Sequence, residues 1–98
     1  MKQHQYRITL EHLADAQGRP SAHAEACTFE VGNHDDLFEI IERMRTRPEF
    51  DEATATAFAV GLKLFGEVML EHPHEALFED MRPQFAAFMK RLKASMPG

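Results

Sequence analysis

Two segments near the N-terminus alternate between apolar and polar residues, which is the pattern of strands with one buried face. It predicts strands over residues 4–13 and 23–31, joined by a reversal at Gly18. Antiparallel pairing would place six apolar side chains on one shared face: Tyr6, Ile8, Leu10, Cys27, Phe29 and Val31. The sequence therefore predicts a hairpin over about 4–31, in which Cys27 is a buried and unreactive thiol.

Three later segments carry apolar residues at helical spacing and predict helices over about 35–46, 51–71 and 80–94. Pro48 ends the first helix, and Pro73 ends the second, because a proline disfavours helical backbone at the residue before it.

Two of the predicted boundaries have alternatives. The second helix begins either with a capping box of Thr46 and Glu49 or with Asp51 as its N-cap. Residues 73–94 form either a short turn followed by a helix capped by Asp80, which we favour, or one kinked helix.

The second helix has few charges, since Lys63 is the only charged residue between Glu52 and Glu67. A stripe of small residues, together with one leucine, predicts a close approach by a neighbouring element: Ala53, Ala57, Gly61 and Leu64. We expect this helix to be central and mostly buried. The fold class is then α+β, with the order ββααα in a single domain over residues 1–98.

Composition and charge exclude several classes of protein. The 98 residues suffice for one core, and the net charge of −5 disfavours binding to nucleic acid. The longest run without a charged residue, 53–62, is too short for a membrane span. One cysteine and no apolar leader indicate a protein of the cytoplasm.

The strongest local candidate for chemistry is residues 71–75, where His72 and His74 lie between two glutamates. These are ligand types for zinc, nickel or copper, but three or four convergent ligands are needed, so we expect a solvated helix end and no tight metal site. His12 and His23, with Glu25, are expected to cluster near the hairpin turn. Because no nucleophile accompanies them, we assign no catalytic residue and no cofactor.

The last helix carries four basic residues that are candidates for an interaction surface: Arg82, Lys90, Arg91 and Lys93. Basic residues late in a helix also suit its dipole without any ligand. Phe78, Phe85 and Phe88 recur at helical spacing and are expected to be core residues.

Three stretches of the chain resemble a family of small bacterial proteins known only as a domain of unknown function. They are residues 6–13 (YRITLEHL), 50–58 (FDEATATAF) and 61–70 (GLKLFGEVML). The resemblance covers nearly the whole chain and implies a bacterial cytoplasmic protein without an assigned activity. It carries over no catalytic or binding residue.

These observations favour a small non-enzymatic interaction or accessory protein. A two-stranded hairpin has open edges and is marginal on its own, so we expect a homodimer, with an unidentified protein as a further partner. The alternative hypothesis is a small-ligand or metal-binding module. A minor enzyme is the third and least favoured hypothesis.

Overall fold

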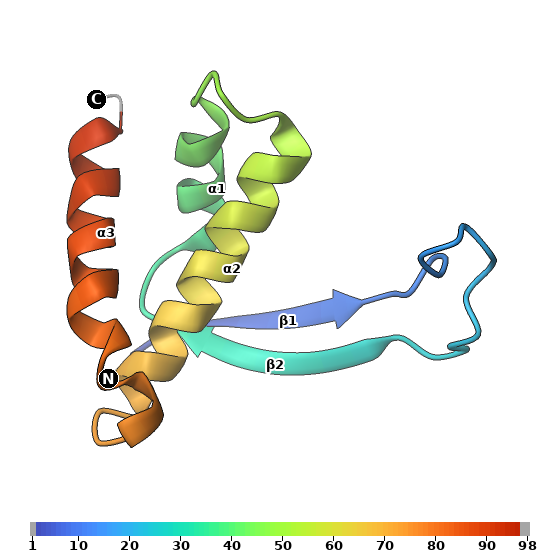
Figure 1. The fold of residues 1–98 in the computed structure, drawn as a ribbon, viewed down its shortest axis with the longest axis horizontal. Helices are drawn as coiled ribbons and strands as arrows, with labels where there is room; N and C mark the ends of the chain where they lie inside the picture. Colours follow the sequence, from blue (N-terminus) through green and yellow to red (C-terminus); the bar gives the residue numbers. More distant parts are fainter. Residues whose placement is uncertain (1, 97–98) are drawn as a thin grey trace. The chain divides into compact units, whose positions relative to one another are not determined.

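The computed structural model describes residues 2–96 and contains, in chain order, two strands, two α-helices, a 3-10 turn and a third α-helix (Figure 1). This is the α+β class and the ββααα order that the sequence predicts. Residues 1–34 and 35–98 form two compact units, a hairpin unit and a helical unit.

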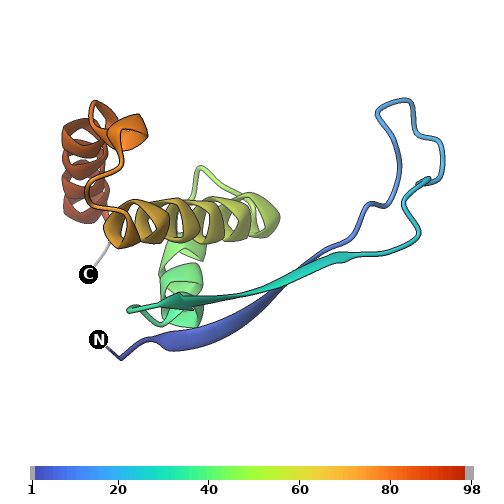
Figure 2. The same cartoon turned by 90° about the horizontal axis from the view of Figure 1, so that it is seen from below.

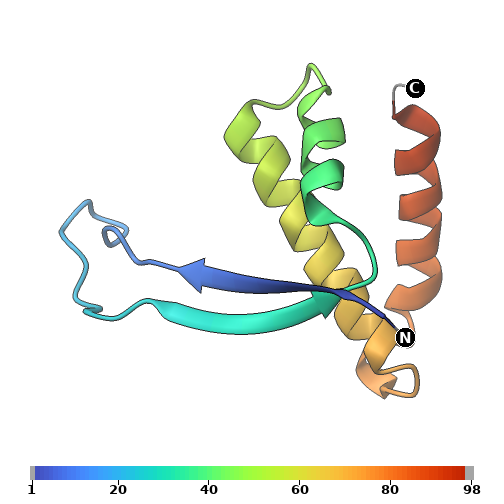
Figure 3. The ribbon, with the colours of Figure 1, turned by 180° about the vertical axis from the view of Figure 1, so that it is seen from behind.

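The hairpin unit contains β1 (His4–Leu10) and β2 (Cys27–Asn33), which pair antiparallel as a two-stranded sheet (Figure 3). The predicted apolar face is confirmed by the register, which sets these residues directly opposite each other: Tyr6 and Val31, Ile8 and Phe29, Leu10 and Cys27. Polar pairs alternate with them, and Arg7 forms an ion pair with Glu30 at 2.8 Å.

Both strands are shorter than predicted, because residues 11–26 fold into local turns. The Asp15 carboxylate accepts hydrogen bonds from the backbone N–H groups of Gln17 and Arg19, each at 2.9 Å. The predicted reversal at Gly18 is confirmed, since this residue has a φ of 84°, in the left-handed region that glycine favours. Such local side-chain bonds compete with the ladder of a longer hairpin.

The helical unit comprises α1 (Leu37–Arg45), α2 (Glu52–Glu71), the 3-10 turn η1 (Ala76–Phe78) and α3 (Met81–Ser95). Residues 73–94 thus form a turn followed by a separate helix, which is the arrangement that the sequence favoured over one kinked helix.

Short side chains set the helix starts. Asp36 caps α1 by accepting from the N–H of Phe38, and Asp51 caps α2 by accepting from the N–H of Thr54 at 2.7 Å. Asp51, and not the alternative capping box, therefore begins α2. Asp80 holds the predicted cap position of α3, but within the described residues its side chain makes no capping bond.

The core of the helical unit lies between α1 and α2, where Met44 contacts Ala55 and Ala59. All three are at most 1% exposed. On another side of α2, Phe65 contacts Phe78 and Phe85 edge to face, with ring centroids 6.2 and 5.5 Å apart. Helix α2 thus contacts elements on more than one side, as Figure 2 shows, and the prediction that it is central is confirmed. The expectation that it is mostly buried is wrong, because its buried residues are Ala55, Ala59, Glu67 and Met69 out of 20.

The expectation that a neighbouring element closely approaches the stripe of small residues on α2 is wrong. Ala53, Ala57 and Gly61 are exposed, and a methyl group built on Gly61 would meet nothing within 4 Å. The close approach occurs at Gly66 instead, where such a methyl group would lie 3.2 Å from the Phe85 ring. Helical spacing identifies a stripe, but the other elements decide which stripe they cover.

Helix α2 has the length and hydropathy of a membrane span, with 20 residues and a mean hydropathy of 1.4 over its most apolar window. Central helices of water-soluble proteins meet the same criterion. Lys63, near its middle, forms an ion pair with Asp35, and Glu67 is buried. Charged groups at these positions are rare in membrane-spanning helices.

Candidate functional site

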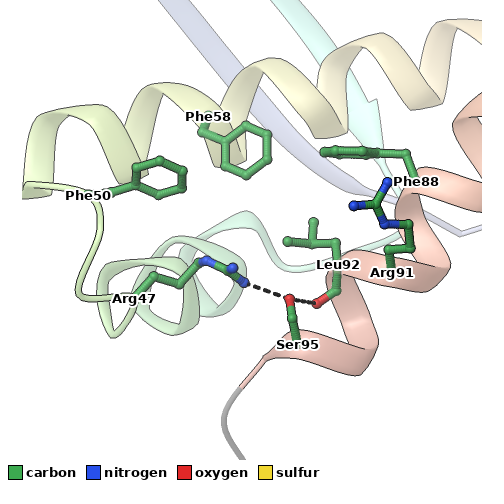
Figure 4. Close-up of a pocket in the computed structure, with 7 residues that line it drawn as sticks. All are labelled: Arg47, Phe50, Phe58, Phe88, Arg91, Leu92 and Ser95. Atoms are coloured by element: carbon green, nitrogen blue, oxygen red, sulfur yellow. Dashed lines mark hydrogen bonds between the residues drawn. The ribbon is translucent and has the colours of Figure 1, made fainter.

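The helical unit contains a pocket of about 340 Å³. Its lining comes from the α1–α2 loop, from α2 and from α3 (Figure 4): Arg47, Phe50, Phe58, Phe88, Arg91, Leu92 and Ser95. Its volume lies in the range of small-molecule sites, which is about 300–1,000 Å³. The lining combines apolar rings with two guanidinium groups and contains no carboxylate.

Three phenylalanines form the aromatic wall of this pocket. Phe58 contacts Phe50 and Phe88 edge to face, with ring centroids 5.6 and 6.2 Å apart. Phe50 and Phe58, with Leu92, also pack against the core around Met44. The wall is therefore held by the same contacts that join α1 to α2, and Phe88 of α3 completes it.

Arg47 is fixed at one side of the pocket, with only 16% of its side chain exposed. Its Nε and Nη2 atoms donate to Glu49 at 3.1 and 2.9 Å, and Nη1 donates to the Ser95 hydroxyl at 3.0 Å. The pKa of Glu49 is lowered, mainly by a hydrogen bond from its own backbone N–H and then by Arg47. Glu49 therefore offsets the charge of Arg47.

Arg91 lies at the opposite side of the pocket, on α3, and Figure 4 shows its side chain beside Phe88. It is exposed, and none of the residues from 2 to 96 forms a hydrogen bond or ion pair with it. Arg91 was a sequence candidate for an interaction surface, and over residues 2–96 it is the guanidinium of this pocket that no carboxylate pairs with. Lys90 and Lys93 are exposed on the same helix but do not line the pocket.

Arg82, the fourth candidate, has a structural role. It is half-buried, and its guanidinium donates to the carbonyl oxygens of Met69, at 2.8 Å, and of His72. It also lies 5.8 Å from the centre of the Phe78 ring. These two carbonyl groups belong to the C-terminal end of α2, where they also accept hydrogen bonds from the backbone N–H groups of His72 and Glu75 at 3.3 and 3.2 Å. Arg82 therefore adds a charged donor to that end of the helix.

The histidines of the 71–75 segment lie apart from this pocket. Both are exposed, and only His74 contributes to a hollow of about 350 Å³, which Glu75, Glu79 and Arg82 also line. Over residues 2–96, no group of three or more histidine, cysteine, aspartate or glutamate side chains is placed to hold a metal ion. That the segment has no tight metal site remains a prediction.

The expected proximity of His12 and His23 is confirmed, because their ring centroids are 5.0 Å apart. The Nδ1 atom of His12 forms a hydrogen bond with the Ser21 hydroxyl. All of this lies in the exposed connection of the hairpin, and among the described residues Glu25 makes no hydrogen bond or ion pair with either ring. A nucleophile–base pair needs a third group to orient the base, and the described part of this loop supplies none.

The prediction that Cys27 is buried is wrong, since the thiol is free and exposed. Cys27 begins β2 on the predicted apolar face, opposite Leu10, which is itself 67% exposed. Alternation identifies which residues share a face, but it does not show that anything covers that face.

Arg47 and Phe50 were not among the residues that the sequence pointed to, because both lie in a loop, where side chains follow no periodic pattern. An arginine and a phenylalanine on either side of Pro48 were the only local signal. Phe88 was expected in the core but is 41% exposed and faces the pocket.

Two comparisons place this chain among known proteins. The family described as a Domain of Unknown Function with a solved structure, DUF3861, matches residues 4–94. The chain is also similar to the crystal structure of a protein of unknown function from Pectobacterium atrosepticum. The two are 36% identical with a TM-score of 0.81, and the match covers 96% of this chain and 100% of the other.

No curated protein matches the chain. The resemblance to small bacterial proteins of unknown function is confirmed by both matches, and neither of them names an activity. Because the family model covers most of its length, the chain belongs to the DUF3861 family.

Proposed function

We propose that this protein is a non-enzymatic interaction protein that acts as a homodimer, to which the hairpin contributes. The observation that carries the proposal is the exposure of the apolar face of the hairpin. None of its six apolar residues is buried, and Leu10 and Phe29 are 67% and 42% exposed. An apolar face of this kind on a small protein indicates a surface for another protein.

The backbone of the hairpin supports the same proposal. Its sheet has only two strands, so each strand has one edge without a partner in the described sheet. Sheets of two strands are marginally stable in water, and open edges accept a strand of another chain. Pairing with a second copy would make a four-stranded sheet.

The polar face is compatible with such a pairing. It carries both signs of charge, with Arg7 and Glu30 joined across the strands. In a twofold symmetric contact, each pair of residues that meet across the interface occurs twice with the two chains exchanged, and a surface of mixed sign allows opposite charges to meet in such pairs. A second copy is therefore the partner that we favour over an unidentified protein.

We also place the protein in the bacterial cytoplasm, because it has one cysteine, Cys27, and that thiol is free and exposed. Free exposed thiols are typical of proteins in a reducing compartment.

Light scattering on the purified protein tests the dimer. We expect a mass of about twice 11.2 kDa. A mass of one chain that persists as the concentration is raised toward the millimolar range would overturn the proposal.

Two leucines provide a matched pair of variants for the role of the hairpin. Leu10 lies on the hairpin and is 67% exposed, whereas Leu77 lies in η1 and is 78% exposed. Neither side chain is buried, so glutamate at either position leaves the monomer folded. We expect Leu10→Glu to weaken the dimer and Leu77→Glu to leave it intact. The reverse result would exclude the hairpin and point to a contact through η1.

A further inference from the structure

We infer that the pocket between Phe58 and Arg91 binds a small aromatic carboxylate. This inference goes beyond the proposed dimer and does not depend on it, because every lining residue belongs to the helical unit. The two proposals can therefore fail separately.

The charges of the pocket select an anion. The lining of the pocket has two guanidinium groups and no carboxylate. Glu49 lies beside the pocket and is already paired with Arg47. Since Arg91 has no hydrogen bond or ion pair with residues 2–96, its planar fork is available to a ligand. A carboxylate matches this fork, because its two oxygens accept two parallel N–H bonds.

The two arginines have different parts in this recognition. Arg91 is the anchor that binds the carboxylate. Arg47 already donates to Glu49 and to the Ser95 hydroxyl, so most of its donor groups are used. Its charge is offset by Glu49, and its bond to Ser95 ties the α1–α2 loop to the end of α3. Arg47 is therefore a positioning residue.

The apolar part of the pocket selects an aromatic ring. Phe50, Phe58 and Phe88 meet at interplanar angles of 70° and 76°, so the pocket offers both ring faces and ring edges. An aromatic ligand can continue this edge-to-face pattern, which stabilises ring pairs beyond their burial alone. An aliphatic chain would be stabilised only by the burial of its apolar surface, without ring contacts.

The size of the pocket limits the ligand. Its volume of about 340 Å³ is close to the lower end for small-molecule sites. A single ring or two fused rings with one carboxylate suit a pocket at this end of the range.

The test uses 2-naphthoate as the probe, with the full-length protein and isothermal titration calorimetry. We expect a dissociation constant of about 1 mM or tighter, which is ordinary for a ligand of this size. Two reference compounds separate the contributions: 2-naphthamide keeps the rings without the charge, and decanoate keeps the charge without a ring. We expect both to bind more weakly than 2-naphthoate.

Variants on α3 then locate the site. Arg91→Gln is expected to weaken 2-naphthoate binding by about tenfold, because it removes a charged donor from the contact. Lys93→Gln removes another exposed cation from the same helix, outside the pocket, and is expected to leave the binding unchanged. Phe88→Leu keeps an apolar side chain at the wall and is expected to reduce the preference for 2-naphthoate over decanoate.

The variants at positions 91 and 93 alter exposed side chains, so circular dichroism is expected to show the native fold in both. The inference would be overturned if 2-naphthoate gave no heat of binding at a concentration 10-fold above the expected dissociation constant. Equal effects of Arg91→Gln and Lys93→Gln would also overturn it, because they would mean that 2-naphthoate responds to the net charge of the helix and not to the pocket.

Discussion

Replacing Gly61 by alanine tests the way in which α2 is placed against its neighbours. Glycine in a helix interior costs about 0.8–1.0 kcal/mol relative to alanine, because its backbone loses more freedom on folding. Gly61 lies near the middle of α2, and a methyl group there meets no atom within 4 Å. The substitution therefore gains the full helix propensity with no steric cost, and we expect the free energy of unfolding to rise by about 0.8–1.0 kcal/mol.

Gly66 of the same helix provides the matched control. Alanine at Gly66 gains the same propensity, but its methyl group would lie 3.2 Å from two carbons of the Phe85 ring. This ring must shift by a few tenths of an ångström, and it also contacts Phe65. We expect Gly66→Ala to stabilise the protein less than Gly61→Ala, and the difference between them measures the cost of moving Phe85.

Thermal and urea unfolding followed by circular dichroism measure both variants. For a domain of this size, 1 kcal/mol corresponds to a shift in melting temperature of about 4–8 °C. A melting temperature of Gly61→Ala below that of the parent protein would refute the reasoning, because it would mean that the exposed stripe of α2 is covered. Repeating the measurement at two protein concentrations shows whether a second copy is what covers it.

Three other predictions follow from the packing and the caps. Met44→Ala should lower the free energy of unfolding by about 2–5 kcal/mol, because it empties the centre of the α1–α2 core, and a loss below 1 kcal/mol in urea unfolding would contradict that core. Arg82→Gln removes a charged donor from two carbonyls at the end of α2 and should cost about 1–3 kcal/mol, whereas no change would show that the backbone N–H groups of His72 and Glu75 suffice for these carbonyls. The pKa of Asp51 is lowered from 3.8, mainly by the hydrogen bond from the Thr54 N–H, so its contribution to stability is present above that value and is lost as the pH falls through the lower folded pKa. Asp51→Asn should abolish this acid-dependent part of the stability, and an unaltered pH profile would contradict the cap.

The sequence by itself determined the features that depend on neighbouring residues. Apolar side chains at every second position set the register of the hairpin, because a slip of one residue would turn each of them to the other face. Tyr6 opposite Val31 is the result. The end of α2 likewise follows from short-range chemistry, with the proline at position 73 as the stop signal. The sequence left the start of α2 open between Asp51 and the capping box of Thr46 and Glu49, and the structure shows Asp51 as the N-cap.

Tertiary structure alone decided which faces are covered and which distant groups meet. The sequence stripe of α2 that contains Gly61 is exposed, because packing against Met44 buries the face of Ala55 and Ala59 instead. The candidate site depends on contacts of the same kind, since Arg47 precedes α2 and reaches Ser95 at the end of α3. No local pattern encodes such pairs, because they form only when the helices have packed and their relative positions are fixed.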